Sequence, residues 1–308
     1  LRMEIATSTA TDRLPGLTVG FRVFPLERTE GQRNSPSKQR IVLSSPFRLV
    51  PKQGIGPMNE IRTYDYSFVV PAFNEESHLD LTLTALEKCM EGEAGYRGEI
   101  VVVDNNSSDR TAEIAKARGV RVVFEPYNQS SKARNQGAAQ SKGENLFFVD
   151  ADTIVPPDLF RDALNLMKGG ACGGGGSVLS FDRKNGSWFW RDLVPSFWNG
   201  VSRNLRLAAG SFLFCRRDFF FECGGFSEKV YAGEEIFFSR KLKKLCKRES
   251  KDFVILKDNP VITSSRKLNW FSNWQLLCSM LVVLCVPFAI RSRRLCSFWY
   301  RRPASSDG

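Results

Sequence analysis

The sequence contains little histidine and no closely paired cysteines, and these absences exclude several classes of protein. His78 is the single histidine among 308 residues, and no two of the eight cysteines are spaced as C-x-x-C. This argues against a Cys/His zinc site and against a hydrolase that depends on a histidine base. His78 lies beside the expected start of a helix, and we interpret it as a surface residue. Scattered cysteines in a chain of this length favour a reduced, intracellular protein.

Long apolar runs are also scarce. The mean hydropathy of −0.25 excludes a polytopic membrane protein, and the 42% hydrophobic and 25% charged residues are ordinary globular values. The net charge of +11 is concentrated near the one long apolar run, since residues 236–308 contain fifteen Lys or Arg and four Asp or Glu. This position favours an anionic membrane surface as partner and argues against nucleic acid.

The two ends of the chain differ in composition from its centre. Residues 1–60 show neither strand nor helix periodicity, which predicts a disordered or loosely attached extension. Residues 269–308 contain the apolar run 276–290, which as a helix would be roughly 22 Å long, short of the ~30 Å bilayer core. Its flanking residues are Trp270, Phe271 and Trp274 before it and Arg291, Arg293 and Arg294 after it. We interpret the segment as an interfacial or re-entrant helix, with a buried closing helix as the alternative.

Strands and helices alternate from Tyr66 onward. Apolar runs predict strands at 66–70, 99–103, 120–124 and 145–149, the first of them ended by Pro71. Helical spacing predicts a helix with Leu79, Leu83, Leu86 and Met90 on one face, a helix capped by Asp109 and a third over 132–140. Such alternation predicts a mostly parallel open α/β sheet with helices on both faces.

Polar residues follow three of these strands. They lie in segments 71–75, 104–107 and 150–152. Because ligands of open α/β sheets bind at the carboxyl ends of the strands, these segments are expected to converge on one site. Neither a G-x-G-x-x-G turn after the first strand nor a P-loop is present, which argues against a dinucleotide dehydrogenase and a P-loop enzyme. We interpret the glycines at 173–176 as a strand entry where backbones pack closely.

Asp150 and Asp152 stand one residue apart where the apolar run 146–149 ends. Two carboxylates at this spacing can engage one hard divalent cation, Mn²⁺ or Mg²⁺, which in turn holds the diphosphate of a nucleotide. A solvated turn is the alternative. The apolar strand before the pair favours the metal site.

Five motifs together resemble a family 2 glycosyltransferase of the GT-A fold. They are Phe68-Val69-Val70-Pro71-Ala72-Phe73-Asn74-Glu75, residues 101–111, Lys132-Ala133-Arg134-Asn135, Asp150-Ala151-Asp152, and Gly224-Gly225-Phe226 with Gly233-Glu234-Glu235. The resemblance covers about residues 64–268 and implies a single catalytic domain. The implied reaction is metal-assisted, inverting transfer of a sugar from a nucleoside-diphosphate sugar to an acceptor hydroxyl. Contact of segment 269–308 with a membrane would place the catalytic domain in the cytoplasm, where nucleotide sugars are made, peripheral to or anchored in that membrane. The expected acceptor is a sugar or a lipid-linked molecule.

The resemblance also implies roles for the matched residues. Pro71, Asn74 and Glu75 would contact the nucleoside and Asp104 the edge of its base, although Asp104 would alternatively cap the following turn. The remaining donor-binding candidates are Lys132 and Arg134, which would face the diphosphate or be surface groups, and Asp150. UDP and GDP both stay open as carriers.

The catalytic base is expected among two adjacent glutamates that open a helix. The family usually has Glu-Asp here with the aspartate as base, so Glu235 is the expected base and Glu234 its orienting or acceptor-binding neighbour. Adjacent helical residues point about 100° apart, so only one would face the acceptor. The alternative is that both merely stabilise the helix N-terminus.

This sequence departs from some relatives at one metal-binding position. The stretch ending at Arg266 holds no histidine where those relatives carry a metal ligand, so the third metal position would fall to water or a phosphate oxygen.

The alternatives to an enzyme of this type are a catalytically inactive nucleotide-sugar-binding protein and a nucleotidyltransferase. Asn74-Glu75 argues against the latter, which normally begins with a Gly-rich basic loop.

Overall fold

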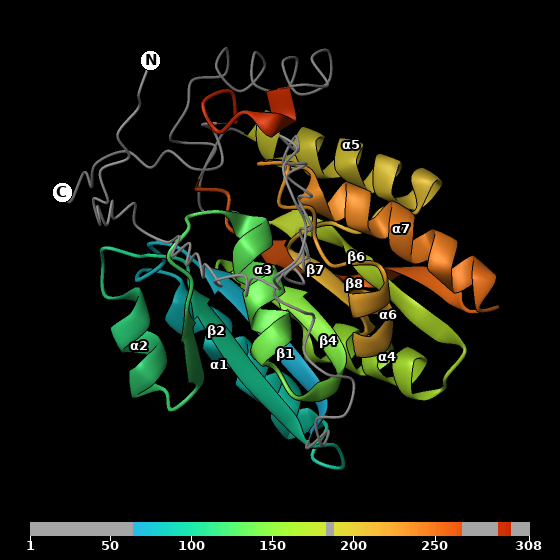
Figure 1. Cartoon of the computed structure of the whole chain (residues 1–308), viewed down its shortest axis with the longest axis horizontal. Coiled ribbons are helices and arrows are strands. Elements are labelled where there is room, and N and C mark those ends of the chain that lie inside the picture. The colour runs from blue at the N-terminus through green and yellow to red at the C-terminus, as the bar shows by residue number, and fades with distance from the viewer. Residues whose placement is uncertain (1–63, 183–187, 267–288, 297–308) are drawn as a thin grey trace, which may run out of the picture. The chain divides into compact units, whose positions relative to one another are not determined.

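The computed structural model describes residues 64–182, 188–266 and 289–296. They contain an eight-stranded sheet in the order β3-β2-β1-β4-β7-β6-β8-β5, and Figure 1 shows this sheet with the helices packed around it. The strands are β1 (Tyr64–Ala72), β2 (Gly98–Asp104), β3 (Arg121–Phe124), β4 (Gly143–Val149), β5 (Thr153–Ile154), β6 (Cys172–Phe181), β7 (Phe212–Arg216) and β8 (Asp252–Thr263). The helices are α1 (Leu79–Gly92), α2 (Thr111–Ala117), α3 (Ser130–Gln140), α4 (Pro157–Lys168), α5 (Trp188–Leu205), α6 (Arg217–Glu222), α7 (Glu234–Arg248) and the short 3-10 helix η1 (Ala289–Arg291).

The sheet is mostly parallel, as expected. Strands β3, β2, β1 and β4 run parallel, and β6 runs parallel to β8. Strand β7 is inserted antiparallel between β4 and β6, and β5 is antiparallel to β8. The antiparallel strand joins the two parallel groups into one sheet.

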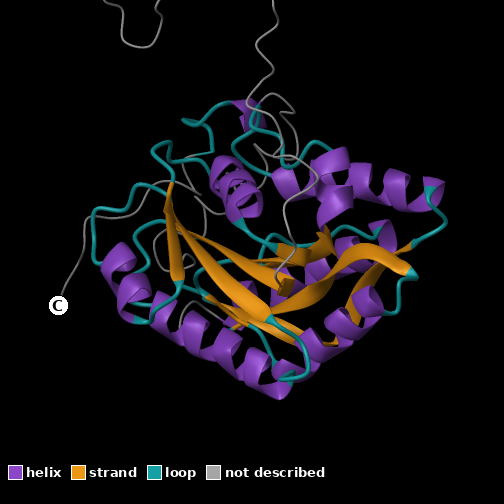
Figure 2. Ribbon diagram, turned by 60° about the horizontal axis from the view of Figure 1, so that its bottom comes forward, coloured by secondary structure: helices purple, strands orange, loops and turns teal. Residues whose placement is uncertain are grey.

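Helices cover both faces of the sheet, and a hydrophobic core lies under each set (Figure 2). Because successive strand side chains point to opposite faces, Phe68 and Phe147 belong to one core while Val69 and Phe148 belong to the other. Helices α1, α2 and α4 close the first core, and α3, α6 and α7 close the second. The predicted layered α/β architecture is confirmed.

The helix faces read from the sequence are buried. Leu79, Leu83 and Leu86 of α1 are fully buried, and Met90 is partly buried against the same core. The N-cap residue of α2 is Arg110, one position after the predicted Asp109. Asp109 nevertheless accepts the backbone N–H of Thr111, in the first turn of the helix, at 2.9 Å.

Strand β1 does not end at Pro71 as predicted; it continues to Ala72. Its pairing with β4 stops at the Val69–Phe148 pair, while its pairing with β2 continues through Pro71 and Ala72. Over these last residues β1 is therefore an edge strand, where a missing N–H is tolerated.

The glycine run lies inside β6 and is packed closely, as interpreted. A Cβ atom on Gly175 would lie 2.0 Å from the carbonyl oxygen of Val254, and one on Gly176 would lie 2.5 Å from the Cβ of Ala208. The Val254 backbone at Gly175 and the Ala208 side chain at Gly176 thus occupy the space that a side chain would need.

Replacing Gly175 with alanine is expected to lower the free energy of unfolding by about 1–3 kcal/mol, the usual effect of overpacking. The new methyl group would collide with the Val254 carbonyl oxygen, a backbone atom that cannot easily move away. Gly92→Ala is the matched control, since no atom lies within 4 Å of a Cβ built there. Urea unfolding followed by circular dichroism measures both variants. Equal stability of the two would contradict the close packing.

The extension 1–60 and almost all of the apolar run 276–290 lie outside the described residues. Across the three described ranges, no helix combines the length and apolar character needed to cross a bilayer.

Candidate active site

The carboxyl ends of β1, β2 and β4 meet at one edge of the sheet. Ala72 pairs with Asp104, and the backbone N–H of Asn105 donates to the Ala72 carbonyl at 2.8 Å. Strand β4, on the other side of β1, ends at Val149, directly before Asp150. The three polar segments predicted to converge therefore lie together.

Asn74 ties the loop after β1 to the loop after β2. Its backbone N–H donates to the Ser107 hydroxyl at 3.0 Å, and its side-chain oxygen accepts the Ser108 N–H at 2.8 Å. Its φ of 51° lies in the left-handed region, which asparagine adopts more readily than most residues. Next to it, the N–H of Glu75 donates to the Thr111 hydroxyl at 2.7 Å.

Asp104 is buried and caps its own turn. Its Oδ1 accepts the backbone N–H of Ser107 at 3.0 Å, which is the turn-capping alternative considered for this residue. Recognition of a base by Asp104, and contact of Pro71 with the nucleoside, stay predictions.

The two basic residues of α3 have different surroundings. The ammonium of Lys132 lies 3.7 Å from the centre of the Tyr127 ring, a cation–π contact. Arg134 is buried and reaches into a group of acidic side chains instead. Diphosphate binding by either residue stays a prediction.

Arg134 bridges the two acidic motifs. Its Nη2 donates to Oδ1 of Asp150 at 2.7 Å and its Nη1 donates to Oε1 of Glu234 at 2.6 Å. Nη1 also donates to the Ser130 hydroxyl at 2.9 Å. Burial lowers the pKa of Arg134, but the carboxylates of Asp150, Glu234 and Glu235 together raise it by more, so the guanidinium stays charged. A single cation thus joins residues that stand far apart in the sequence.

Replacing Arg134 with methionine is expected to destabilise the protein by about 3–5 kcal/mol, because the buried Glu234 carboxylate loses its partner. Arg110→Met is the control, since its ion pair with Glu76 is exposed and such pairs contribute about 0–1 kcal/mol. Thermal and urea unfolding of both variants measure the difference. If the Arg134 variant loses no more unfolding free energy than the control, the Arg134 bridge does not stabilise the fold as predicted.

The two glutamates at the start of α7 have different environments. Gly233, in the left-handed conformation with φ 72°, precedes the helix. Glu234 is held by Arg134, whereas no described residue forms an ion pair with Glu235. Burial, followed by repulsion from Glu234, raises the pKa of Glu235 to about 8. Glu235 therefore holds a proton more tightly than an ordinary carboxyl group.

Two amide side chains to which the sequence assigned no role, Asn135 and Gln129, fix the loop before α7. Asn135 accepts the Phe226 N–H at 2.9 Å and donates to the Phe226 carbonyl at 3.0 Å. Gln129 donates to the carbonyls of Glu228 and Val230 at 2.9 and 3.0 Å. Asn135 stands in a motif that the resemblance covers, while Gln129 carries no local sequence signal.

Arg266 is a further residue of the site that the sequence did not identify. It is 9% exposed, and its Nη2 donates to Oε2 of Glu75 and, at 3.3 Å, to Oδ2 of Asp152. Its Nη1 lies 2.8 Å from Nδ1 of His78. His78 is thus partly buried at this site, so its interpretation as a surface residue is wrong. Arg266 comes shortly after the end of β8. Strand β8 pairs with β5, which begins directly after Asp152, and this pairing brings Arg266 to the Asp152 segment.

The chemistry of Asp150 and Asp152 suits a hard divalent cation, since carboxylate oxygens are its preferred ligands. Each of the two carboxylates already contacts an arginine, Arg134 or Arg266. Within the described ranges, no three His, Cys, Asp or Glu residues gather closely enough to hold an ion. The residues therefore fit a cation that arrives with phosphate oxygens as further ligands.

Comparison with known proteins gives a consistent assignment. The profile described as "Glycosyl transferase family 2" matches residues 67–227, more than half of the chain. The dolichyl-phosphate beta-glucosyltransferase ALG5C of Trichomonas vaginalis is 32% identical over 142 residues, which cover 42% of this chain. The chain spans only 41% of the length of that relative.

Two solved structures share the fold at low sequence identity. S. aureus TarS 1–349 in complex with UDP-GlcNAc is 20% identical with a TM-score of 0.51, over 66% of this chain and 59% of that one. Mannosyltransferase PcManGT from Pyrobaculum calidifontis, in complex with GDP-Man and Mn²⁺, is 18% identical with a TM-score of 0.51, over 74% and 65%.

Proposed function

The chain belongs to glycosyl transferase family 2, and on this premise we propose that it transfers a sugar from a nucleoside-diphosphate sugar to an acceptor hydroxyl, with inversion at the anomeric carbon. The observation that carries the proposal is the Arg134 bridge. One buried cation contacts both Asp150, where the donor diphosphate would lie, and Glu234, beside the expected base. The bridge lies at the carboxyl edge of the sheet, where open α/β sheets bind ligands.

The proposed step uses this chain's residues as follows. The bond between C1 of the sugar and the diphosphate oxygen breaks, and its electron pair leaves with the diphosphate. The acceptor oxygen bonds to C1 from the opposite face, and Glu235 takes the proton of the hydroxyl. Arg134 holds Glu234 in place through their ion pair, whereas Glu235 has no ion-pair partner among the described residues and is left to act as the base.

Asp150 and Asp152 would hold a divalent cation, Mn²⁺ or Mg²⁺, together with the donor. When bound, the cation would stabilise the negative charge of the departing diphosphate. The Mn²⁺ and GDP-Man in the PcManGT complex support this part of the proposal. The carboxylate chemistry of the pair supports it independently.

A lipid-linked acceptor is the class we propose, with a sugar acceptor as the alternative. The name of the Trichomonas relative specifies a dolichyl phosphate, which is a lipid acceptor. The aromatic, apolar and basic residues of 269–308 support contact with a membrane, and we propose that the site faces the cytoplasm, where nucleotide sugars are made. Flotation with anionic liposomes tests the membrane contact, and a protein that stays in the soluble fraction would contradict it.

A donor screen tests the central proposal. The purified full chain is incubated with Mn²⁺ or Mg²⁺ and a panel of UDP- and GDP-sugars, and release of the nucleoside diphosphate is measured. We expect release from one donor class, stimulated by an acceptor and lost in Glu235→Gln. Nucleotide binding without turnover for any donor and acceptor would favour the inactive binding protein. Absence of both would contradict the proposal.

A further inference from the structure

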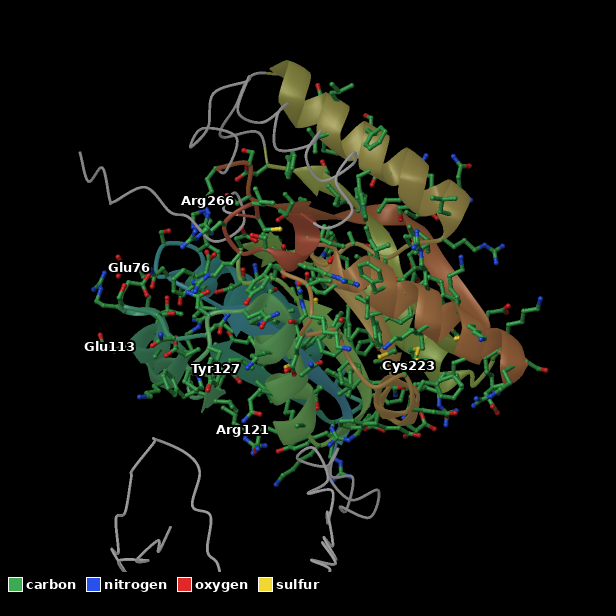
Figure 3. All side chains as sticks on the ribbon, turned by 45° about the horizontal axis from the view of Figure 1, so that its top comes forward. Glu76, Glu113, Arg121, Tyr127, Cys223 and Arg266 are labelled. Carbon is green, nitrogen blue, oxygen red and sulfur yellow. The ribbon has the colours of Figure 1, made fainter. Side chains whose placement is uncertain are left out.

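Arg266 lies between two acidic segments of the donor site. Figure 3 shows it near Glu76, the residue that follows Glu75. Glu75 follows β1 and Asp152 follows β4, and the Arg266 guanidinium contacts both. The two carboxylates are 5% and 7% exposed. Arg266 therefore neutralises buried negative charge that would be costly to leave alone.

His78 supports the guanidinium from its other side. Its Nδ1 lies 2.8 Å from Nη1 of Arg266, and its Nε2 lies 3.4 Å from the Ser264 hydroxyl. For the Arg266 contact the imidazole must accept at Nδ1, which requires its neutral form. Arg266 is thus held by side chains from three segments: the loop after β1, the start of α1 and Asp150-Ala151-Asp152, a D-x-D motif.

Arg134 pairs with Asp150 and Arg266 pairs with Asp152, so each aspartate of the D-x-D motif contacts an arginine. A free divalent cation that approached Asp152 would meet the positive charge of Arg266 and compete with it for the same oxygen. A nucleoside diphosphate changes this balance, because its phosphate oxygens can bind a guanidinium and a cation at once.

We propose that Arg266 is a diphosphate-binding residue that excludes free divalent cations from Asp152 until the nucleotide arrives. In the nucleotide-free protein it holds Glu75 and Asp152. With the donor bound it contacts the diphosphate and leaves Asp152 to the cation. This rests on the proposed function, and it makes nucleotide and cation bind cooperatively rather than independently.

Two binding measurements on Arg266→Gln test the proposal. The first is Mn²⁺ binding to the nucleotide-free protein, followed by electron paramagnetic resonance. The second is calorimetric binding of UDP and GDP at saturating Mn²⁺. We expect Mn²⁺ alone to bind at least about tenfold more tightly to the variant, because two buried carboxylates lose their cation, and the nucleotide to bind at least about tenfold more weakly.

The opposite directions separate this role from a structural one, since a damaged site would weaken both ligands. Arg161→Gln, on the exposed face of α4, is the control and should change neither affinity. If the glutamine variant does not fold, Arg266→Lys decides: a lysine keeps Mn²⁺ excluded yet lowers nucleotide affinity, because it lacks the planar fork of arginine. Unchanged Mn²⁺ affinity in Arg266→Gln, or unchanged nucleotide affinity in both variants, overturns the proposal.

These results are distinguishable from failure of the proposed function. A wild-type protein that binds neither UDP nor GDP contradicts the glycosyltransferase proposal and, with it, diphosphate binding by Arg266. A wild-type protein that turns over a donor normally, together with an Arg266→Gln variant of unchanged affinities, overturns the role of Arg266 alone.

Discussion

Replacing Asp152 with asparagine is expected to lower sugar-transfer turnover by about a thousandfold. A divalent cation contributes several kcal/mol of stabilisation to the departing charge, and each ~1.4 kcal/mol is a factor of about ten in rate. Asparagine preserves the size of this buried residue and can still accept the Thr263 hydroxyl, which lies 3.4 Å from Oδ1. The fold should therefore survive while the charge is lost.

Steady-state turnover and Mn²⁺-dependent nucleotide binding measure this effect. Asp158→Asn is the matched control, because Asp158 lies in the exposed first turn of α4 and removes the same charge at a distance. Wild-type turnover in Asp152→Asn would contradict the metal assignment. So would undiminished turnover of the unmodified protein in excess chelator.

The parts of the fold that follow from local pattern were predictable. Side chains spaced for one helix face, such as Leu79, Leu83 and Leu86, have few ways to be buried, so periodicity specifies them. That Asp150 lies directly at the end of a strand was likewise predictable, because the apolar residues that form the strand immediately precede it in the sequence. The insertion of β7 between β4 and β6 does not, because strand order depends on long-range packing.

The same division holds within the site. The sequence identifies Asp152, Glu234 and Glu235 through motifs, yet it contains no sign that Arg134 joins Asp150 to Glu234. Arg266 and Glu75 stand 191 positions apart, and only the folded chain brings them into contact. An isolated arginine in a basic segment has no local pattern that separates a buried site residue from a surface one. Ion pairs between distant segments are therefore the part of the site that sequence reasoning missed.

Replacing Glu235 with glutamine is expected to lower kcat by about a hundredfold or more while nucleotide-sugar binding survives, because the amide cannot accept the acceptor's proton. Glu249→Gln, just beyond the far end of the same helix, is the control for a lost carboxylate. If Glu234→Gln abolishes turnover per folded molecule and Glu235→Gln does not, the two roles are reversed. If both variants keep turnover, neither glutamate is the base.

The raised pKa of Glu235 adds a pH signature to this prediction. A base with a pKa of about 8 is mostly protonated at neutral pH, so kcat/KM should rise as the pH increases through about 8 and then level off. The native state holds this proton more tightly than the unfolded chain, whose glutamate pKa is about 4.3. The contribution of Glu235 to stability is therefore fully present below the unfolded-state pKa of about 4.3, and it is lost as the pH rises toward the folded-state pKa of about 8. Glu235→Gln should lack both effects, so its residual rate should not rise through this range, and its stability relative to the unmodified protein should increase with pH. Because one carboxyl group controls both measurements, a rate that still rises through pH 8 in the variant would contradict Glu235 as the base even if kcat had fallen.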